Sequence, residues 1–316
     1  MIGILGAGAF GTALAVALGR EGRDVRLWAR DAHHVATMRK ARMNAARLPG
    51  IGFPESVSVT AEIDDILGAK AILLAVPMQA LRGLLGAEPR LNGHVLVACC
   101  KGVDLTSLQG PAGLIAAACP DARVGILTGP SFASDIAKGL PTALTLACHD
   151  GEALQNLLST PALRLYRSED IIGAELGGAL KNVIAIAAGV VIGAGLGDSA
   201  RAALMARGYA EMTRFAIAHG AEAETLAGLS GFGDLVLTCT SAQSRNFRYG
   251  QALGSGTGFD ASVTVEGAAT AKAVSNIAKK TNIEMPITDM IAALIGQTIT
   301  LPQAISALLS RPLKQE

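Results

Sequence analysis

One lysine lies in the most apolar part of the chain, where burying a charged side chain costs free energy. Lys181 sits between the apolar stretches 176–180 and 183–188. Desolvation disfavours the charged form of a buried lysine and lowers its pKa, which suits a proton donor and acceptor near neutral pH. A structural ion pair with Glu175 or Asp234 is the alternative. We favour a role in proton transfer.

Two further charged residues lie in the segment 231–246. Asp234 stands between a glycine-rich turn and an apolar run, where we expect it to be partly buried and able to orient a lysine. Arg245, within Ser244-Arg245-Asn246, offers a planar guanidinium that can bind a phosphate through two parallel hydrogen bonds. Alone, this triplet is typical of an ordinary loop, and it gains meaning only together with the other candidate sites.

The start of the chain forms a candidate phosphate-binding loop. An apolar strand at 2–5 runs into Gly6-x-Gly8-x-x-Gly11, followed by a helix at 12–19 and a second strand at 24–28. Gly6 permits a tight turn, Gly8 lets a pyrophosphate approach the backbone, and Gly11 lets the helix pack on the sheet. Glycine spacing alone is a weak signal in a chain with 37 glycines. The strand and helix around it favour a dinucleotide site over a glycine-rich turn.

The end of the second strand bears on which dinucleotide is bound. An NAD-specific fold usually has an acidic residue about 20 residues after the glycine loop, where it accepts a hydrogen bond from the ribose. Here Arg30 holds that place and Asp31 follows. Arg30 could pair with the 2′-phosphate of NADP, stack on adenine, or face solvent. We therefore expect the protein to accept NADPH, and the sequence does not exclude NADH.

Three other loops should lie on the same rim as the glycine loop. Pro77 ends the apolar run 70–76, Lys101 and Gly102 follow the run 94–100, and the segment 129–133 follows the run 123–127. Ligands bind beyond the carboxyl ends of parallel strands in such sheets. We expect Lys101 to face this cleft, with a solvated lysine in a turn as the alternative.

These residues need a sheet and a set of helices to position them. Up to about residue 170, apolar runs alternate with helical stretches at 79–85 and 108–118, which predicts a doubly wound Rossmann domain. Two more strands, at 142–147 and 163–166, are expected at its edge. From residue 171 strand-like runs disappear. Alanine-rich helical stretches follow at 171–193, 199–219, 222–229, 262–280, 287–296 and 302–309. The prediction is an α/β fold with a dinucleotide-binding domain at 1–170 and an all-helical, substrate-binding domain at 171–316.

Composition narrows the class of protein. The net charge is +1 and aromatic residues make up 3% of the chain, so we expect no binding to nucleic acid. The most apolar run, 183–196, has only 14 residues, whereas a membrane span needs about 20. We expect a buried core helix there, with no stable membrane insertion. Because a strand begins at the second residue, we expect no signal peptide.

The cysteines and histidines do not form a recognisable metal or disulfide pattern. The five cysteines include one adjacent pair and no C-x-x-C, and the five histidines lack metal-ligand spacing. We therefore expect reduced, mostly buried thiols, a cytoplasmic location and no metal.

Taken together, these segments resemble the NAD(P)-dependent glycerol-3-phosphate dehydrogenases of bacterial type. A generic Rossmann reductase would share only the first of them, and they span nearly the full chain in order. The matching segments are GAGAFGTALA (6–15), LWARD (27–31), AVP (75–77), CCKG (99–102), GPSFA (129–133), ALKNVIAIAAG (179–189), GFGDLVLTCTS (231–241), SRNFRYG (244–250) and VEG (265–267).

The resemblance implies a reversible hydride transfer between NAD(P)H and dihydroxyacetone phosphate, giving sn-glycerol 3-phosphate for phospholipid synthesis, in a cytoplasmic homodimer. It implies that Lys181 is the proton donor or acceptor, supported by Asp234 and Thr238, and that Lys101 lies where cofactor and substrate meet. The implied cofactor contacts are Gly6, Gly8, Ala9, Phe10, Gly11, Arg30, Lys101, Ala133, Arg245, Thr264 and Glu266. The implied substrate contacts are Lys101, Gly129, Ser131, Lys181, Asp234, Ser244, Arg245 and Asn246.

The chain departs from the family pattern at two of these positions. Position 9 commonly carries Ser or Asn, so Ala9 could contribute only its backbone. Position 264 is often aliphatic, which makes Thr264 the weakest assignment. Two other functions remain as alternatives. Another reductase of this plan, acting on a sugar acid or 2-oxo acid, would not need the lysine pair, and a non-catalytic dinucleotide sensor would not need Lys181 in an apolar helix.

Overall fold

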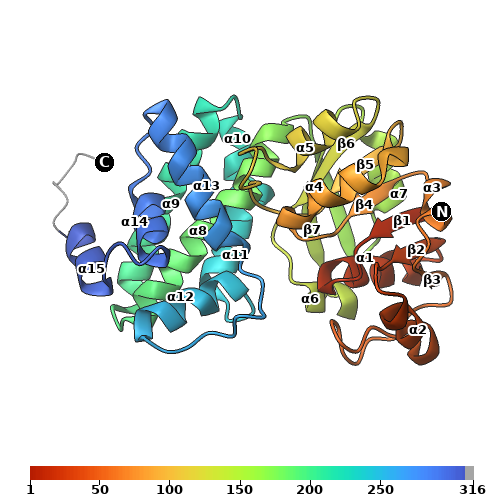
Figure 1. Ribbon diagram of the computed structural model, residues 1–316, viewed down its shortest axis with the longest axis horizontal. Helices are drawn as coiled ribbons and strands as arrows, with labels where there is room; N and C mark the ends of the chain where they lie inside the picture. Colours follow the sequence, from red (N-terminus) through yellow and green to blue (C-terminus); the bar gives the residue numbers. More distant parts are fainter. Residues whose placement is uncertain (310–316) are drawn as a thin grey trace.

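A computed structural model describes residues 1–309 as a sheet domain followed by a helical domain (Figure 1). The two lie side by side along the longest axis of the molecule, and the chain passes from one to the other between β8 and α8. The predicted fold class, a Rossmann domain followed by an all-helical domain, is confirmed. The end of the expected second domain, 310–316, lies outside the described residues.

The sheet has eight strands in the order β3-β2-β1-β4-β5-β6-β7-β8. Neighbouring strands are parallel, except that β7 runs antiparallel to β6. The strands are β1 (Ile2–Leu5), β2 (Val25–Trp28), β3 (Val57–Thr60), β4 (Ile72–Leu74), β5 (Val95–Ala98), β6 (Arg123–Thr128), β7 (Thr142–Ala147) and β8 (Leu163–Ser168).

One expectation about this sheet needs correction, and one strand was not predicted. Only β8 lies at the edge, because β7 pairs with β6 on one side and with β8 on the other. The opposite edge is β3, a strand that the sequence analysis missed. Its sequence, VSVT, alternates apolar and polar residues and so is not a continuous apolar run.

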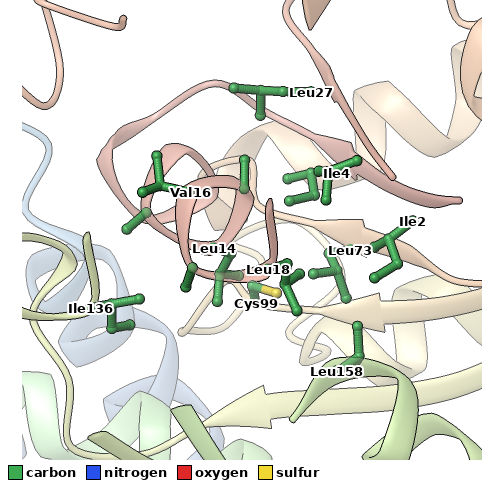
Figure 2. Packing of buried hydrophobic residues seen from close by; sticks show 14 of the residues in the cluster. Ile2, Ile4, Leu14, Val16, Leu18, Leu27, Leu73, Cys99, Ile136 and Leu158 are labelled. Carbon is green, nitrogen blue, oxygen red and sulfur yellow. The ribbon is translucent and has the colours of Figure 1, made fainter. Parts of the chain in front are cut away.

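Helices cover both faces of the sheet. One face carries α1 (Ala9–Arg20), α2 (Ala32–Ala41), α6 (Ala133–Lys138) and α7 (Glu152–Leu158). The other carries α3 (Asp64–Leu67), α4 (Met78–Ala87), α5 (Pro111–Ala118) and the start of α8 (Ile171–Gly193). Figure 2 shows the core of the first face, where Leu14 and Leu18 of α1 lie against Ile4 and Leu73 of the strands. This packing fixes the N-terminus of α1 at the carboxyl end of β1.

Two arginines cover the backbone of the edge strand β3. Its carbonyl groups at Val57 and Val59 point away from β2. Arg39 Nε donates to Val59 O at 2.7 Å, and Arg42 Nη1 donates to Val57 O at 3.0 Å. The outward carbonyls of this edge are therefore already hydrogen-bonded within the molecule.

The helical domain is built around α8. The other helices are α9 (Gly197–Ala218), α10 (Ala223–Ala227), α11 (Asp234–Thr240), α12 (Arg245–Ser255), α13 (Glu266–Thr281), α14 (Pro286–Ile295) and α15 (Leu301–Leu309), with a π-helical turn at Leu229–Gly233. Among the described residues, α8 is the one helix long and apolar enough to cross a membrane, and most of it is buried inside the protein. The predicted helical stretches are confirmed, whereas no helix was predicted at α11 or at α12.

A carboxylate from one helix satisfies the start of another. Glu211 on α9 is buried, and its oxygens accept hydrogen bonds from Ile287 N at 2.9 Å and Thr288 N at 2.8 Å. These are amides of the first turn of α14, which have no partner inside their own helix. Glu211 therefore ties α14 to α9.

Candidate active site

Lys181 lies in the middle of α8, at the junction of the two domains. Its side chain is buried, with 6% of the residue exposed, and its Nζ donates to Asp234 Oδ1 at 2.9 Å and to Thr238 Oγ1 at 2.6 Å. Asp234 and Thr238 are one turn apart on α11, so a single helix presents both acceptors. An ion pair between Lys181 and Asp234 therefore exists, whereas Glu175 is engaged elsewhere, accepting from Ala112 N at 2.7 Å.

Lys101 reaches the same carboxylate from the sheet domain. Its Nζ donates to Asp234 Oδ2 at 2.5 Å and to Gly129 O at 3.2 Å. These contacts place the Lys101 ammonium between the two domains and not in a solvated turn. Asp234, which is 1% exposed rather than partly buried, lies between two ammonium groups. One negative and two positive charges leave the cluster with a net positive charge.

Burial and charge act on this cluster in opposite directions. Burial lowers the pKa of Lys181, the charge of Asp234 partly restores it, and the result is a pKa of about 8. Burial alone would raise the pKa of Asp234, but Lys101 and Lys181 outweigh it, and the pKa falls below its usual value. Asp234 is thus a fixed negative charge, and Lys181 can exchange a proton near neutral pH.

Close packing of α8 on the sheet sets the position of Lys181. Gly178 lies next to the end of β6, where an added Cβ would come within 2.5 Å of Thr128 Oγ1. The glycine therefore allows α8 to approach the strand. Lys181 follows less than one turn later and so lies beside the loop that carries Gly129.

The glycine loop has the geometry that a pyrophosphate requires. Gly6 adopts a φ of +118°, and a Cβ on Gly11 would lie 2.1 Å from Gly6 O. A Cβ on Gly8 would meet no atom within 4 Å, so the backbone is open on that side. Among residues 1–309, no side chain forms a capping hydrogen bond at the N-terminus of α1, and the first turn of α1 contains no acidic residue. The amides of Ala9 and Phe10 begin that turn. The residues present therefore fit a bound dinucleotide.

A buried asparagine holds the glycine loop in place. Asn44 Nδ2 donates to Ala7 O at 2.9 Å and to Thr12 Oγ1 at 2.8 Å, and the residue is fully buried. The sequence analysis missed Asn44. It lies in an irregular segment after α2, and asparagine is common in such turns.

At the end of β2, Arg30 and Asp31 have separate surroundings. Arg30 is exposed beside the carboxyl end of the strand. Asp31 caps α2, with its Oδ1 accepting from His33 N at 2.9 Å and His34 N at 3.2 Å. These backbone hydrogen bonds, first from His34 and then from His33, lower the pKa of Asp31. Its carboxylate is already used in capping the helix.

The triplet Ser244-Arg245-Asn246 starts a helix instead of forming a loop. Ser244 is the N-cap of α12, its Oγ accepting from Phe247 N at 3.2 Å, and Arg245 is exposed in the first turn. Asn246 is buried and links three helices. Its Nδ2 donates to Asn182 Oδ1 at 2.8 Å, and its Oδ1 accepts from Gly267 N at 3.0 Å. Asn182, next to Lys181, is a second residue that the sequence analysis missed.

Glu266 lies at the start of α13, across from the sheet domain. Its Oε1 accepts from Met78 N, the first amide of α4, at 3.4 Å. Burial raises the pKa of Glu266, with Arg245 the strongest opposing charge. Thr264 is exposed on the loop before α13.

On the sheet side, the loop after β6 leads into α6. Gly129 has a φ of +135°, and its carbonyl accepts from Lys101 and, at 3.4 Å, from Ser131 Oγ. Ala133 is the first residue of α6. Next to it, Ser134 Oγ donates to Gln243 Oε1 of the helical domain at 2.8 Å.

The structure therefore groups the candidate residues into three clusters. The first joins the lysines to Asp234, Thr238 and the loop of Gly129. The second links the start of α12 to the start of α13. The third is the glycine loop, with Arg30 at the neighbouring strand end. Among residues 1–309, no three His, Cys, Asp or Glu side chains form a metal site, and all five cysteines are unpaired and buried.

Two family models together match most of the chain. The N-terminal part of the NAD-dependent glycerol-3-phosphate dehydrogenases matches residues 1–154, and the C-terminal part matches residues 170–306. The chain belongs to this family. Glycerol-3-phosphate dehydrogenases are oxidoreductases, and NAD or NADP is the cofactor.

Relatives in this family are similar over their full lengths. The glycerol-3-phosphate dehydrogenase [NAD(P)+] of Cereibacter sphaeroides is 68% identical over 320 residues, covering 100% of both chains. That of Paracoccus denitrificans is 57% identical over 319 residues, covering 100% of this chain and 99% of the relative. The crystal structure of glycerol-3-phosphate dehydrogenase from Coxiella burnetii matches with a TM-score of 0.93 and 37% identity, covering 98% of each chain.

Proposed function

We propose that Lys181 is the proton donor when this glycerol-3-phosphate dehydrogenase reduces dihydroxyacetone phosphate to sn-glycerol 3-phosphate. The observation that carries the proposal is the buried cluster in which Asp234 lies between Lys181 and Lys101. Asp234 and Thr238 hold the ammonium of Lys181 in one orientation, and burial keeps its pKa low enough for proton transfer. The bound NAD(P)H supplies the hydride.

The net positive charge of the cluster matches the charge that develops during reduction. When the carbonyl carbon accepts a hydride, negative charge grows on its oxygen. Two ammonium groups fixed beside one carboxylate stabilise that oxygen without having to reorganise. Lys181 then transfers a proton to it, and the alcohol results. In the reverse direction, neutral Lys181 accepts the hydroxyl proton. Lys101, Gly129 and Ser131 line the same cleft and contact the substrate.

The substrate phosphate belongs at the start of α12. Arg245 is exposed in the first turn, next to the buried cap Ser244, so a guanidinium and a helix N-terminus are available together. Asn246 contributes by holding α12 to α8 and α13, and its amide atoms already have partners in the protein. Binding energy from the distant phosphate thereby positions the carbonyl at the lysines.

The dinucleotide belongs on the glycine loop. The N-terminal amides of α1, at Ala9, Phe10 and Gly11, receive the pyrophosphate, and Gly6 and Gly8 give it room. Arg30 pairs with the 2′-phosphate of NADP. The neighbouring carboxylate of Asp31 is engaged in capping α2. Both NADPH and NADH are accepted. Ala133, Arg245, Glu266 and Thr264 lie on the loops and helix ends around the cleft and complete the cofactor site.

The proposal also covers the domain bounds, the location and the oligomeric state of the enzyme. The cofactor domain comprises residues 1–170 and the helical domain 171–316, which is supported by the end of β8 at Ser168 and the start of α8 at Ile171. The burial of α8 supports a protein without stable membrane insertion. We place the enzyme in the cytoplasm as a homodimer. Its product supplies the backbone of phospholipids.

A comparison of two substrates tests this function. The purified protein is given NADPH and either dihydroxyacetone phosphate or dihydroxyacetone, and the loss of nicotinamide absorbance is followed. We expect fast oxidation with the phosphate ester and little with dihydroxyacetone. Equal rates with both compounds would show that no phosphate is recognised. Turnover only with a sugar acid or a 2-oxo acid would assign a different reductase.

A further inference from the structure

A hydrogen bond between the domains lies beside both proposed binding sites. Ser134 Oγ of α6 donates to Gln243 Oε1, which stands on the short connection between α11 and α12. Ser134 follows the proposed cofactor residue Ala133, and Gln243 comes two residues before Arg245. The two ends are 109 residues apart in sequence, so only the folded arrangement of the domains brings them together.

Each end of this hydrogen bond belongs to a firmly held piece of structure. Ile136 of α6 lies in the same core as the residues of α1, so Ser134 is tied to the helix that carries the glycine loop. On the other side, Arg248 Nη1 donates to Ala242 O at 2.7 Å, and Gln243 N donates to Ser241 Oγ at 3.1 Å. The hydrogen bond therefore connects the cofactor loop to the start of α12.

Three other polar contacts between the domains are more deeply placed. Lys101 contacts the buried Asp234, and Glu175 and Glu266 contact the first amides of α5 and α4. Gln243, by contrast, is exposed, and Ser134 is half-buried. Water can therefore reach both groups when this hydrogen bond opens.

We propose that Ser134 and Gln243 form a clasp that closes the cleft over the bound dinucleotide and slows its dissociation. The proposal rests on the proposed cofactor site at the glycine loop. Ser134 and Gln243 are positioning residues, because they act by holding the two walls of the cleft together. They take no part in hydride or proton transfer.

The test measures how fast NADPH leaves the enzyme. NADPH fluorescence is followed in a stopped-flow displacement experiment with the full chain. Ser134→Ala and Gln243→Met each remove one side of the hydrogen bond, and we expect dissociation to become about 3- to 10-fold faster, as the loss of one neutral hydrogen bond implies. Ser134→Thr keeps the hydroxyl and should restore a slow rate. Ser255→Ala, an exposed serine bonded within α12, is the matched control and should change nothing.

A double variant distinguishes a clasp from two independent effects. If Ser134 and Gln243 act through each other, Ser134→Ala with Gln243→Met should be no faster than either single variant. Additive rates, or unchanged rates in both single variants, would overturn the clasp while turnover and its dependence on Lys181 stay intact. A wild-type protein that does not bind NADPH would overturn the proposed function as well. Matching urea midpoints would confirm that the variants fold alike.

Discussion

The side chain of Lys181 forms a buried ion pair and is also the proton donor that we propose. Its position in an apolar stretch was visible in the sequence, and so was Asp234 as a partner. An ion pair was the alternative to a role in proton transfer; the structure contains this ion pair, and we propose that Lys181 has both roles. Asn44 and Asn182 were missed because their partners are distant in sequence, at Ala7 and Asn246.

Removal of the Lys181 ammonium should abolish most of the turnover. In Lys181→Ala the proposed proton donor is lost, and general acid catalysis is worth roughly 10²–10⁴-fold. Steady-state rates with dihydroxyacetone phosphate measure the loss, and fluorescence titration should show that NADPH still binds. Turnover within a few-fold of wild type would assign the proton to another group.

The pH dependence should differ in sign for the two directions. Burial places the pKa of Lys181 at about 8, below its ordinary value of 10.5. Reduction needs the ammonium, so its rate should fall as the pH rises through about 8. Oxidation of glycerol 3-phosphate needs the neutral amine and should rise over the same interval. Asp234 raises this pKa, so Asp234→Asn should move both transitions to lower pH. An unmoved profile would contradict the coupling.

The exposed position of Arg30 leads to a prediction about cofactor choice. If Arg30 pairs with the 2′-phosphate, Arg30→Ala should weaken NADPH binding much more than NADH binding. A charge-assisted hydrogen bond contributes about 1.5–3 kcal/mol, which corresponds to roughly 10- to 150-fold in affinity. Titrations of both cofactors measure the difference. Equal losses would indicate stacking on adenine, and no loss would indicate a solvated side chain.

At the scale of elements, local sequence patterns predicted most strands and helices but not how the strands pair. The strands β1, β4, β5 and β6 and the helix α8 were recognised because each lies in an apolar segment, and β2 because it follows the glycine loop and its helix. The antiparallel pairing of β7 was not visible, since the apolar pattern of 142–147 does not show in which direction this strand runs beside β6. The helix α12 was missed because Ser244 was considered for ligand binding and not as a helix cap.

The carboxylate of Glu211 should be important for stability, because it binds the first turn of α14. Glu211→Ala would leave the amides of Ile287 and Thr288 buried without a partner, and each such group costs about 1–3 kcal/mol. We expect the free energy of unfolding in urea to fall by at least about 2 kcal/mol. Glu211→Gln keeps one acceptor oxygen and should lose less. Glu224→Ala, an exposed glutamate on α10, is the control. An unchanged midpoint in Glu211→Ala would show that water reaches these amides.

At the scale of the whole molecule, α8 belongs to both domains. Ala174, in its first turn, lies in the core beneath the sheet, whereas Val183 and Ile186 lie in the core of the helical domain. The change from alternating to all-helical patterns near residue 171 indicated two domains. It did not indicate that one helix would join their cores. The apolar residues of 171–193 look alike in sequence, whether they pack under the sheet or among the helices.

This shared helix should make the two domains unfold together. Trp28, the single tryptophan, lies on β2 and reports on the sheet domain alone. Far-UV circular dichroism gives weight to the long helices α8 and α9. We expect the urea transitions seen by Trp28 fluorescence and by circular dichroism to coincide. Separate midpoints would show that the domains are energetically independent.

The arginines along β3 have a consequence for the protein in a crowded solution. A bare strand edge can add a strand from another molecule, and repeated addition produces continuous intermolecular sheets. Arg39 and Arg42 occupy the outward carbonyls of Val57 and Val59 with their own guanidinium groups, and two positive charges stand along that margin. A second chain would have to displace these hydrogen bonds and bring its own like charges close. The open sheet of this enzyme is thereby kept from growing at that end.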